Sequence, residues 1–206
     1  MEEVLAAHKV VTLTGPGGIG KTALALRVAQ SVLASTEVDT YLVDLAPVSD
    51  PDLVPSNIAG VLDVGLGGGE SDASFVARAI GTRRILLVID NCEHLIDAVA
   101  KMAETLVHTC VGVSILATSR EKLRIVGEYV YQVVPLSVPT EEDREPDVIL
   151  AQSAVQLFIT RINVAHPAFS PDPGNLRLLA GLCRRLDGIP LAIEFAAARA
   201  ATLGVA

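Results

Sequence analysis

The chain has 206 residues, of which 50% are hydrophobic, 19% charged and 3% aromatic, and its formal net charge is -8. This length and apolar content predict one medium domain, or one domain with a small satellite, around a buried core, and they exclude a disordered or fibrous chain. Lys and Arg together number 16, against 24 for Asp and Glu. Direct binding to nucleic acid is therefore not expected, because it depends mainly on basic residues that neutralise phosphates.

The sequence also argues against a membrane location. Its strongest apolar run covers only residues 85–89, whereas a membrane span needs about 20 apolar residues. Glu2 and Glu3 stand where a secretory signal would carry positive charge. The three cysteines are far apart and lack metal-binding spacing, so they are expected in the core. We therefore predict a cytoplasmic protein with no membrane partner.

Five short apolar runs alternate with helical patterns, as in βαβ units that build a parallel sheet. The predicted strands are residues 10–14, 41–45, 85–89, 113–117 and 129–134. The predicted helices are residues 21–34, 51–62, 71–80 and 95–106, with a Gly-rich loop at 65–69. Residues 1–137 are therefore predicted to form a three-layer α/β domain with a five-stranded parallel sheet.

A change of composition follows this domain. Residues 138–147 combine prolines with the acidic run 141–143 and are predicted to be a linker. Beyond them, apolar residues recur at helical spacing, and Gly188 and Pro190 mark the end of one helix and the start of the next. Residues 148–206 are therefore predicted to form a small, incomplete helical domain.

The segment between the first strand and the first helix matches the P-loop pattern G-x-x-x-x-G-K-[ST]. Glycines let backbone N–H groups turn inward around phosphate oxygens, and the helix N-terminus adds partial positive charge. Lys21 is expected to reach the β- and γ-phosphates, and Thr22 to offer its hydroxyl to Mg²⁺. The residues expected to bind the cofactor here are Gly15, Pro16, Gly17, Gly18, Ile19, Gly20, Lys21, Thr22 and Ala23.

Asp90 ends the third predicted strand, where a carboxylate faces the ligand crevice of an open α/β sheet. Together with Thr22 it is expected to hold Mg²⁺ through water; the alternative is a cap on the helix that begins near Asn91. Many ATPases carry a glutamate base beside this aspartate, whereas this chain has Asn91, with Glu93 displaced. Slow or absent turnover is therefore expected, because activation of water needs an acceptor within reach.

Thr118-Ser119-Arg120 follows the fourth predicted strand and so reaches the same edge of the sheet. An arginine there is placed to contact a γ-phosphate, and a solvated loop arginine is the alternative. The predicted catalytic residues are thus Lys21, Asp90 and Arg120. No N-K-x-D element for guanine occurs in the sequence, which favours ATP and ADP as ligands.

With these residues in place, the chain resembles the STAND class of signal-transduction ATPases, also called AP-ATPases or NB-ARC-like proteins. It looks most like the branch found in bacterial winged-helix and LuxR-type transcriptional regulators. The matching segments are the P-loop with its strand at 11–22, L-V-I-D-N-C-E-H-L at 87–95, A-T-S-R-E at 117–121 and R-L-D-G-I-P-L-A-I-E at 185–194. In this order they are specific to that class.

The resemblance implies a nucleotide switch with an ADP-bound closed state and an ATP-bound open state. It assigns Asp90 as the Walker B acid, Arg120 as the γ-phosphate sensor and Pro190 as a residue packed near adenine. It also implies regulatory or output domains in a longer regulator, and nucleotide-dependent self-association. Similar proteins carry further segments on both sides, so a truncated ATPase core is expected.

The sequence is also compatible with two other functions. One is an autonomous Mg²⁺-dependent ATPase or small-molecule kinase that uses the same loop. The other is a non-catalytic fragment that acts as an interaction domain.

Overall fold

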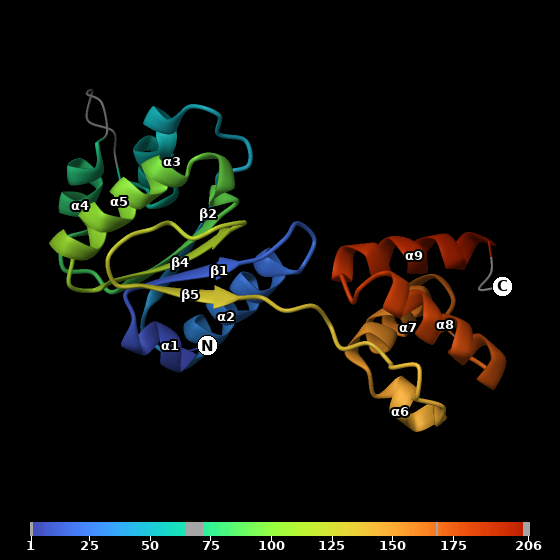
Figure 1. Ribbon diagram of the computed structural model, residues 1–206. Coiled ribbons are helices and arrows are strands. Elements are labelled where there is room, and N and C mark those ends of the chain that lie inside the picture. The colour runs from blue at the N-terminus through green and yellow to red at the C-terminus, as the bar shows by residue number, and fades with distance from the viewer. Residues whose placement is uncertain (1, 65–71, 168, 204–206) are drawn as a thin grey trace. The chain divides into compact units, whose positions relative to one another are not determined.

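The computed structural model describes residues 2–64, 72–167 and 169–203 (Figure 1). The chain divides into two compact units, residues 1–16 with 21–133 and residues 17–20 with 134–206. We call them the sheet unit and the helical unit. The Gly-rich loop predicted at 65–69 lies outside the described residues.

The sheet unit contains the predicted five-stranded parallel sheet. Its strands have the spatial order β2-β3-β4-β1-β5, and every neighbouring pair is parallel. The strands are β1 (Val10–Thr14), β2 (Asp39–Asp44), β3 (Ile85–Asp90), β4 (Val113–Ser119) and β5 (Glu128–Gln132). Each begins or ends within two residues of its predicted run, because short β-branched apolar segments between polar turns leave little freedom in placement.

Helices cover both faces of this sheet (Figure 1). One face carries α3 (Val54–Val61), α4 (Ala73–Ile80) and α5 (Ile96–Thr109), and the other carries α1 (Glu2–Ala7) and α2 (Lys21–Ser35). In β3, Ile85, Leu87 and Ile89 pack in the core under α3, α4 and α5, whereas Leu86 and Val88 pack against α1 and α2. Burial on both faces explains why the run is continuously apolar.

The helix predicted for residues 51–62 is divided into two parts. Asp50 caps the short 3₁₀ helix η1 (Pro51–Leu53) by accepting a hydrogen bond from the Asp52 N–H at 3.0 Å, and α3 follows directly. Pro55 explains the division, because it has no N–H to donate to the Pro51 carbonyl four residues earlier. The six-residue helix α1 was not predicted, since so short a segment shows no periodicity.

The helical unit contains α6 (Pro146–Leu150), α7 (Ser153–Ala165), α8 (Pro173–Arg185) and α9 (Pro190–Leu203). Its core gathers apolar residues of α7, α8 and α9 around Phe158, which is fully buried. The acidic segment predicted as a linker lies against α8: Arg184 Nη1 donates to the Thr140 carbonyl at 3.1 Å.

Gly188 joins α8 to α9 at a position that no other residue fits. Its φ is +66°, in the left-handed region, and the Leu136 N–H donates to its carbonyl at 3.0 Å. A Cβ placed there would lie 2.2 Å from the Leu136 carbonyl oxygen. The approach of two backbones therefore requires glycine.

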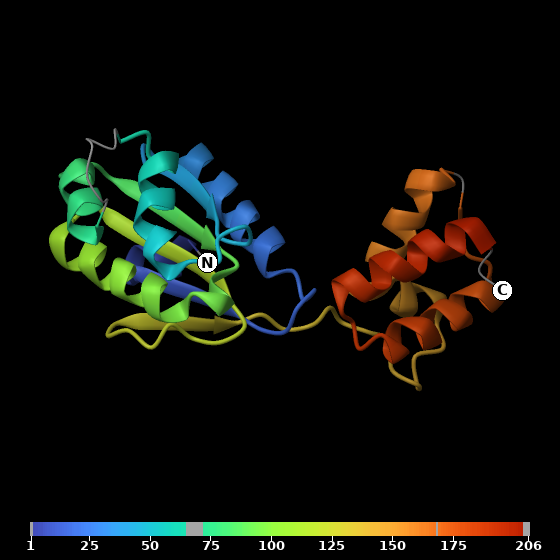
Figure 2. The ribbon, with the colours of Figure 1, turned by 90° about the horizontal axis from the view of Figure 1, so that it is seen from above.

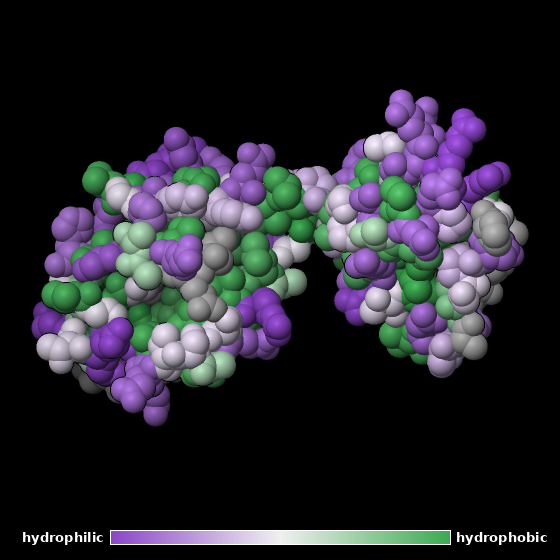
Figure 3. Space-filling view, turned by 90° about the horizontal axis from the view of Figure 1, so that it is seen from below, coloured by the Kyte–Doolittle hydropathy of each residue, from purple (hydrophilic) through white to green (hydrophobic). Residues whose placement is uncertain are grey.

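Hydrophilic residues are spread over each unit on the face seen in Figure 3. Within the described ranges, no helix combines the length and the apolar character needed to cross a bilayer.

Candidate functional site

The strand order brings the predicted motifs of the sheet unit to one edge. In a parallel sheet all carboxyl ends meet at the same edge, and here β4 lies between β1 and β3. The P-loop follows β1, Asp90 ends β3, and Arg120 comes directly after β4. Gly15, Pro16, Lys21, Thr22 and Ala23 belong to this unit, while the predicted residues Gly17, Gly18, Ile19, Gly20 and Pro190 fall in the helical unit.

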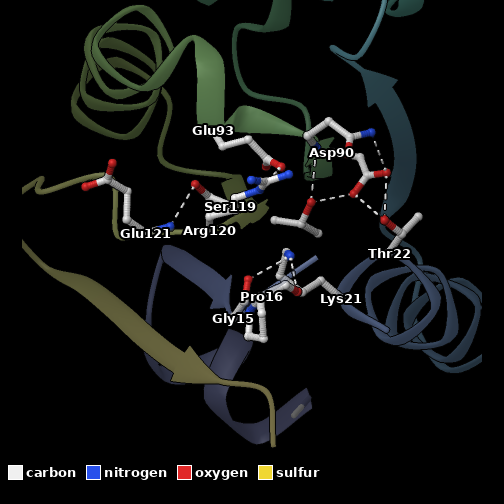
Figure 4. A network of polar contacts seen from close by, with 11 residues as sticks. Gly15, Pro16, Lys21, Thr22, Asp90, Glu93, Ser119, Arg120 and Glu121 are labelled. Atoms are coloured by element: carbon white, nitrogen blue, oxygen red, sulfur yellow. Dashed lines mark hydrogen bonds and ion pairs between the residues drawn. The ribbon is translucent and has the colours of Figure 1, made fainter. Parts of the chain in front are cut away.

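The P-loop backbone has the conformation that its sequence predicts. Gly18 and Gly20 adopt φ values of +76° and +97°, which side chains with a Cβ rarely allow. Lys21 is the first residue of α2 and is 9% exposed. Its Nζ donates to the carbonyls of Gly15 at 2.9 Å and Pro16 at 3.1 Å (Figure 4). The ammonium group is thus held over the start of the loop.

Asp90 lies at the centre of a partly buried hydrogen-bond network. Thr22 Oγ1 donates to both carboxylate oxygens, at 2.9 and 3.0 Å, and Thr118 Oγ1 donates to Oδ1. Asp90 is 5% exposed and Thr118 is 1% exposed. A threonine hydroxyl beside a carboxylate fits Mg²⁺, which prefers oxygen ligands and takes its other positions from water and phosphate.

Asn91 occupies a strained position that its hydrogen bonds explain. It is left-handed, with φ of 62° and ψ of 46°, and its N–H donates to Thr118 Oγ1 at 3.1 Å. Its Nδ2 donates to Asp44 Oδ1 at 2.9 Å and to Asp90 Oδ2 at 3.2 Å. Asn91, and not Asp90, is the N-cap residue of η2 (Cys92–His94), so the capping alternative for Asp90 is wrong.

Two residues of this network were not assigned roles from the sequence. Thr118 belongs to the T-S-R segment, in which only Arg120 was predicted to have a function. Asp44 ends β2 and stands beside Asp90 in the strand register. The Ala46 N–H, followed by the Asn91 amide, holds the pKa of Asp44 below its usual range. An acidic residue at the end of a predicted strand was the only available signal for Asp44.

Arg120 is solvent-exposed and paired with an acid. Its side chain is 68% exposed, and its Nε lies 3.2 Å from Glu93 Oε1. Glu93 comes from η2, immediately beyond β3, so the pair bridges the ends of two adjacent strands (Figure 4).

Replacing Thr118 by valine is expected to lower the free energy of unfolding by about 1–3 kcal/mol, because the buried Asp90 carboxylate and Asn91 N–H lose a partner. Thr12→Val provides the matched control. Thr12 is 0% exposed, and its hydroxyl has no partner among the described residues, so its loss should be neutral or stabilising. Urea denaturation of both variants measures the difference, and equal losses would contradict the assignment.

The cysteines are core residues, as predicted. Cys92, Cys110 and Cys183 are buried, and burial raises the pKa of each thiol, to about 11 for Cys183. Among the described residues no group of three or more His, Cys, Asp or Glu side chains could hold a metal ion.

Residues 6–126 match the protein family described as AAA domain. A Mycobacterium tuberculosis H37Rv protein that carries the name HTH-type transcriptional regulator is 40% identical over 199 residues, covering 97% of this chain and 21% of that protein. An uncharacterized protein of the same strain is 36% identical over 203 residues, covering 98% of this chain and 49% of the relative. The chain thus spans at most half the length of these relatives.

Two solved structures share the fold. The STAND protein with a tetratricopeptide repeat sensor from Pyrococcus horikoshii aligns with a TM-score of 0.54 and 17% identity, over 94% of this chain and 28% of that chain. The Aeropyrum pernix ORC1 protein, solved in complex with DNA, aligns with a TM-score of 0.56 and 20% identity, over 93% and 54%. These likenesses confirm the predicted α/β P-loop NTPase fold. Together with the family match they show that the chain contains a P-loop ATPase domain and belongs to the AAA domain family.

Proposed function

We propose that the chain is an ATP- and ADP-binding switch module of a STAND-type signal-transduction ATPase. The observation that carries this proposal is the network in which the Thr22 hydroxyl and the Thr118 hydroxyl hold the Asp90 carboxylate beside the P-loop lysine. A hydroxyl, a carboxylate and an ammonium group at one sheet edge form the set that binds a Mg²⁺-nucleotide in P-loop proteins.

Each site residue has a part in this proposal. Lys21 contacts the phosphates, Thr22 and Asp90 hold Mg²⁺ directly or through water, and Arg120 senses the γ-phosphate. Pro190 packs near adenine, as the resemblance implies. Bound Mg²⁺ supplies charge neutralisation on the phosphate oxygens.

In this proposal the module is part of a longer bacterial, cytoplasmic regulator of the winged-helix or LuxR type, and other domains of that regulator act on transcription. The relative named as an HTH-type transcriptional regulator supports this, since the chain covers only 21% of it. The net charge of -8 argues against DNA contact by this module, which acts in this proposal through those other domains and through nucleotide-dependent self-association.

Turnover is slow in this proposal because the residue directly after Asp90 is not a carboxylate that could accept a proton from the attacking water. Asn91 stands where a glutamate base would be, and its amide donates to Asp44 and Asp90. The nearby Glu93 carboxylate is paired with Arg120. We expect hydrolysis well below the roughly 1 per second at the low end of kinases.

The test is to purify the chain without added nucleotide, denature it and identify any released nucleotide by chromatography. Titration of the emptied, refolded protein with ATP, ADP and GTP in the presence of Mg²⁺ follows by calorimetry. We expect retained ADP, or binding of both adenine nucleotides in preference to GTP. Circular dichroism confirms that each sample is folded.

A folded sample that binds neither ATP nor ADP would refute the proposal and support the non-catalytic fragment. Steady turnover at 1 per second or more, abolished by Lys21→Ala, would instead support the autonomous ATPase.

A further inference from the structure

We propose that Glu93 determines how strongly the site prefers ATP or ADP, because it holds Arg120 until a γ-phosphate displaces it. The inference rests on the proposed function, and it assigns a role to a carboxylate outside the P-loop and outside the Asp90 network. Its starting point is the ion pair between Arg120 Nε and Glu93 Oε1.

The strand order places this pair beside the phosphate site. β4 lies between β1, which leads into the P-loop, and β3, which ends at Asp90. Ser119 stands opposite Thr14 in the register of β4 and β1, so Arg120 leaves the sheet beside Gly15, the first residue of the loop. Figure 4 shows the Arg120 guanidinium against the Glu93 carboxylate.

The pair is weak enough to be exchanged. Within the described residues Arg120 makes one hydrogen bond to Glu93, at 3.2 Å through Nε, and not the two parallel bonds of a bidentate pair. Its side chain is 68% exposed, and a single exposed ion pair contributes little. A γ-phosphate offers a multiply charged, geometrically matched partner that arginine binds more strongly.

Separation of Arg120 from Glu93 nevertheless costs free energy. Its other oxygen, Oε2, is buried and has no hydrogen-bond partner in the part of the chain that the structure describes. An unpaired buried acceptor is unfavourable, and it becomes more so when Arg120, the ion-pair partner of the carboxylate, leaves. ATP binding therefore includes the cost of separating the pair, whereas ADP has no γ-phosphate and leaves the pair intact. Glu93 consequently lowers the affinity for ATP relative to ADP.

The test is calorimetric titration of the whole chain and its Glu93→Gln variant with ATP and with ADP, both with Mg²⁺. We expect the variant to bind ATP about two- to five-fold more tightly, the range that corresponds to loss of one exposed ion pair, and to change ADP binding less than two-fold. Glu93→Ala, which removes the whole carboxylate, should change the ratio in the same direction.

Glu121→Gln is the matched control. Glu121 also follows β4, carries the same charge and pairs with Arg124, not with Arg120. It should leave the ratio of ATP to ADP affinity unchanged. In an Arg120→Ala background, Glu93→Gln should lose its effect, because no sensor remains to be released.

Equal changes for ATP and ADP, no change, or a gain that persists without Arg120 would overturn the role of Glu93. Those outcomes require a wild-type chain that binds nucleotide. Failure of the wild-type chain to bind either nucleotide refutes the proposed function itself, so the two failures are distinguishable.

Discussion

Replacing Lys21 by alanine is expected to weaken the binding of both ATP and ADP about 100-fold. Each charge-assisted hydrogen bond from an ammonium group contributes about 1.5–3 kcal/mol, and every 1.4 kcal/mol is a factor of ten in affinity. The side chain is almost fully buried, and its Nζ is held over the Gly15 and Pro16 carbonyls. Lys21 is the only basic residue in the P-loop segment 15–22. Isothermal titration with each nucleotide measures the loss.

Lys101→Ala is the control for charge alone, since Lys101 is exposed on α5 and lies outside the site. It should leave both affinities within about two-fold. Thermal unfolding gives a second readout, because a ligand that binds only the folded state raises the midpoint. ATP should therefore stabilise the wild-type chain and Lys101→Ala, but not Lys21→Ala. Unchanged ATP affinity in Lys21→Ala would place the phosphates elsewhere.

Replacing Phe158 by alanine is expected to lower the free energy of unfolding of the helical unit by about 3–5 kcal/mol. Phe158 is the largest of the fully buried side chains and lies in the core that α7, α8 and α9 share. Removing it leaves a cavity that a small, loop-connected bundle fills only in part. Urea denaturation followed by circular dichroism measures the change.

Phe195→Ala provides the comparison within the same unit. Phe195 lies on α9 and is 65% exposed, so its replacement should change the free energy of unfolding by less than about 0.5 kcal/mol. Similar losses in the two variants would mean that the Phe158 core does not hold the unit together. The sheet unit has a separate core, so hydrogen exchange there should be little affected by either substitution.

Local sequence patterns determined the elements and the motifs. Five short apolar runs predicted the five strands, and the three central strands β1, β3 and β4 are buried almost along their whole length, as such runs indicate. The P-loop pattern located Lys21 and Thr22, since glycines with positive φ and a helix start are needed around phosphates. Asp90 and Arg120 were found because each directly follows a predicted strand, and parallel strands end at one edge. Pro55 divided a predicted helix, a local effect that the sequence contained but periodicity concealed.

Only the tertiary structure decided which side chains meet. The order β2-β3-β4-β1-β5 is not encoded in any single segment, because it results from how crossover helices pack on the two faces. That order brings the Thr118 hydroxyl onto Asp90, sets Asp44 beside Asn91 and pairs Glu93 with Arg120. Each of these contacts joins residues from different strands or the turns that follow them. The sequence by itself therefore specified a P-loop domain and its charged candidates, while long-range packing specified the hydrogen bonds that hold Asp90 and restrain Arg120.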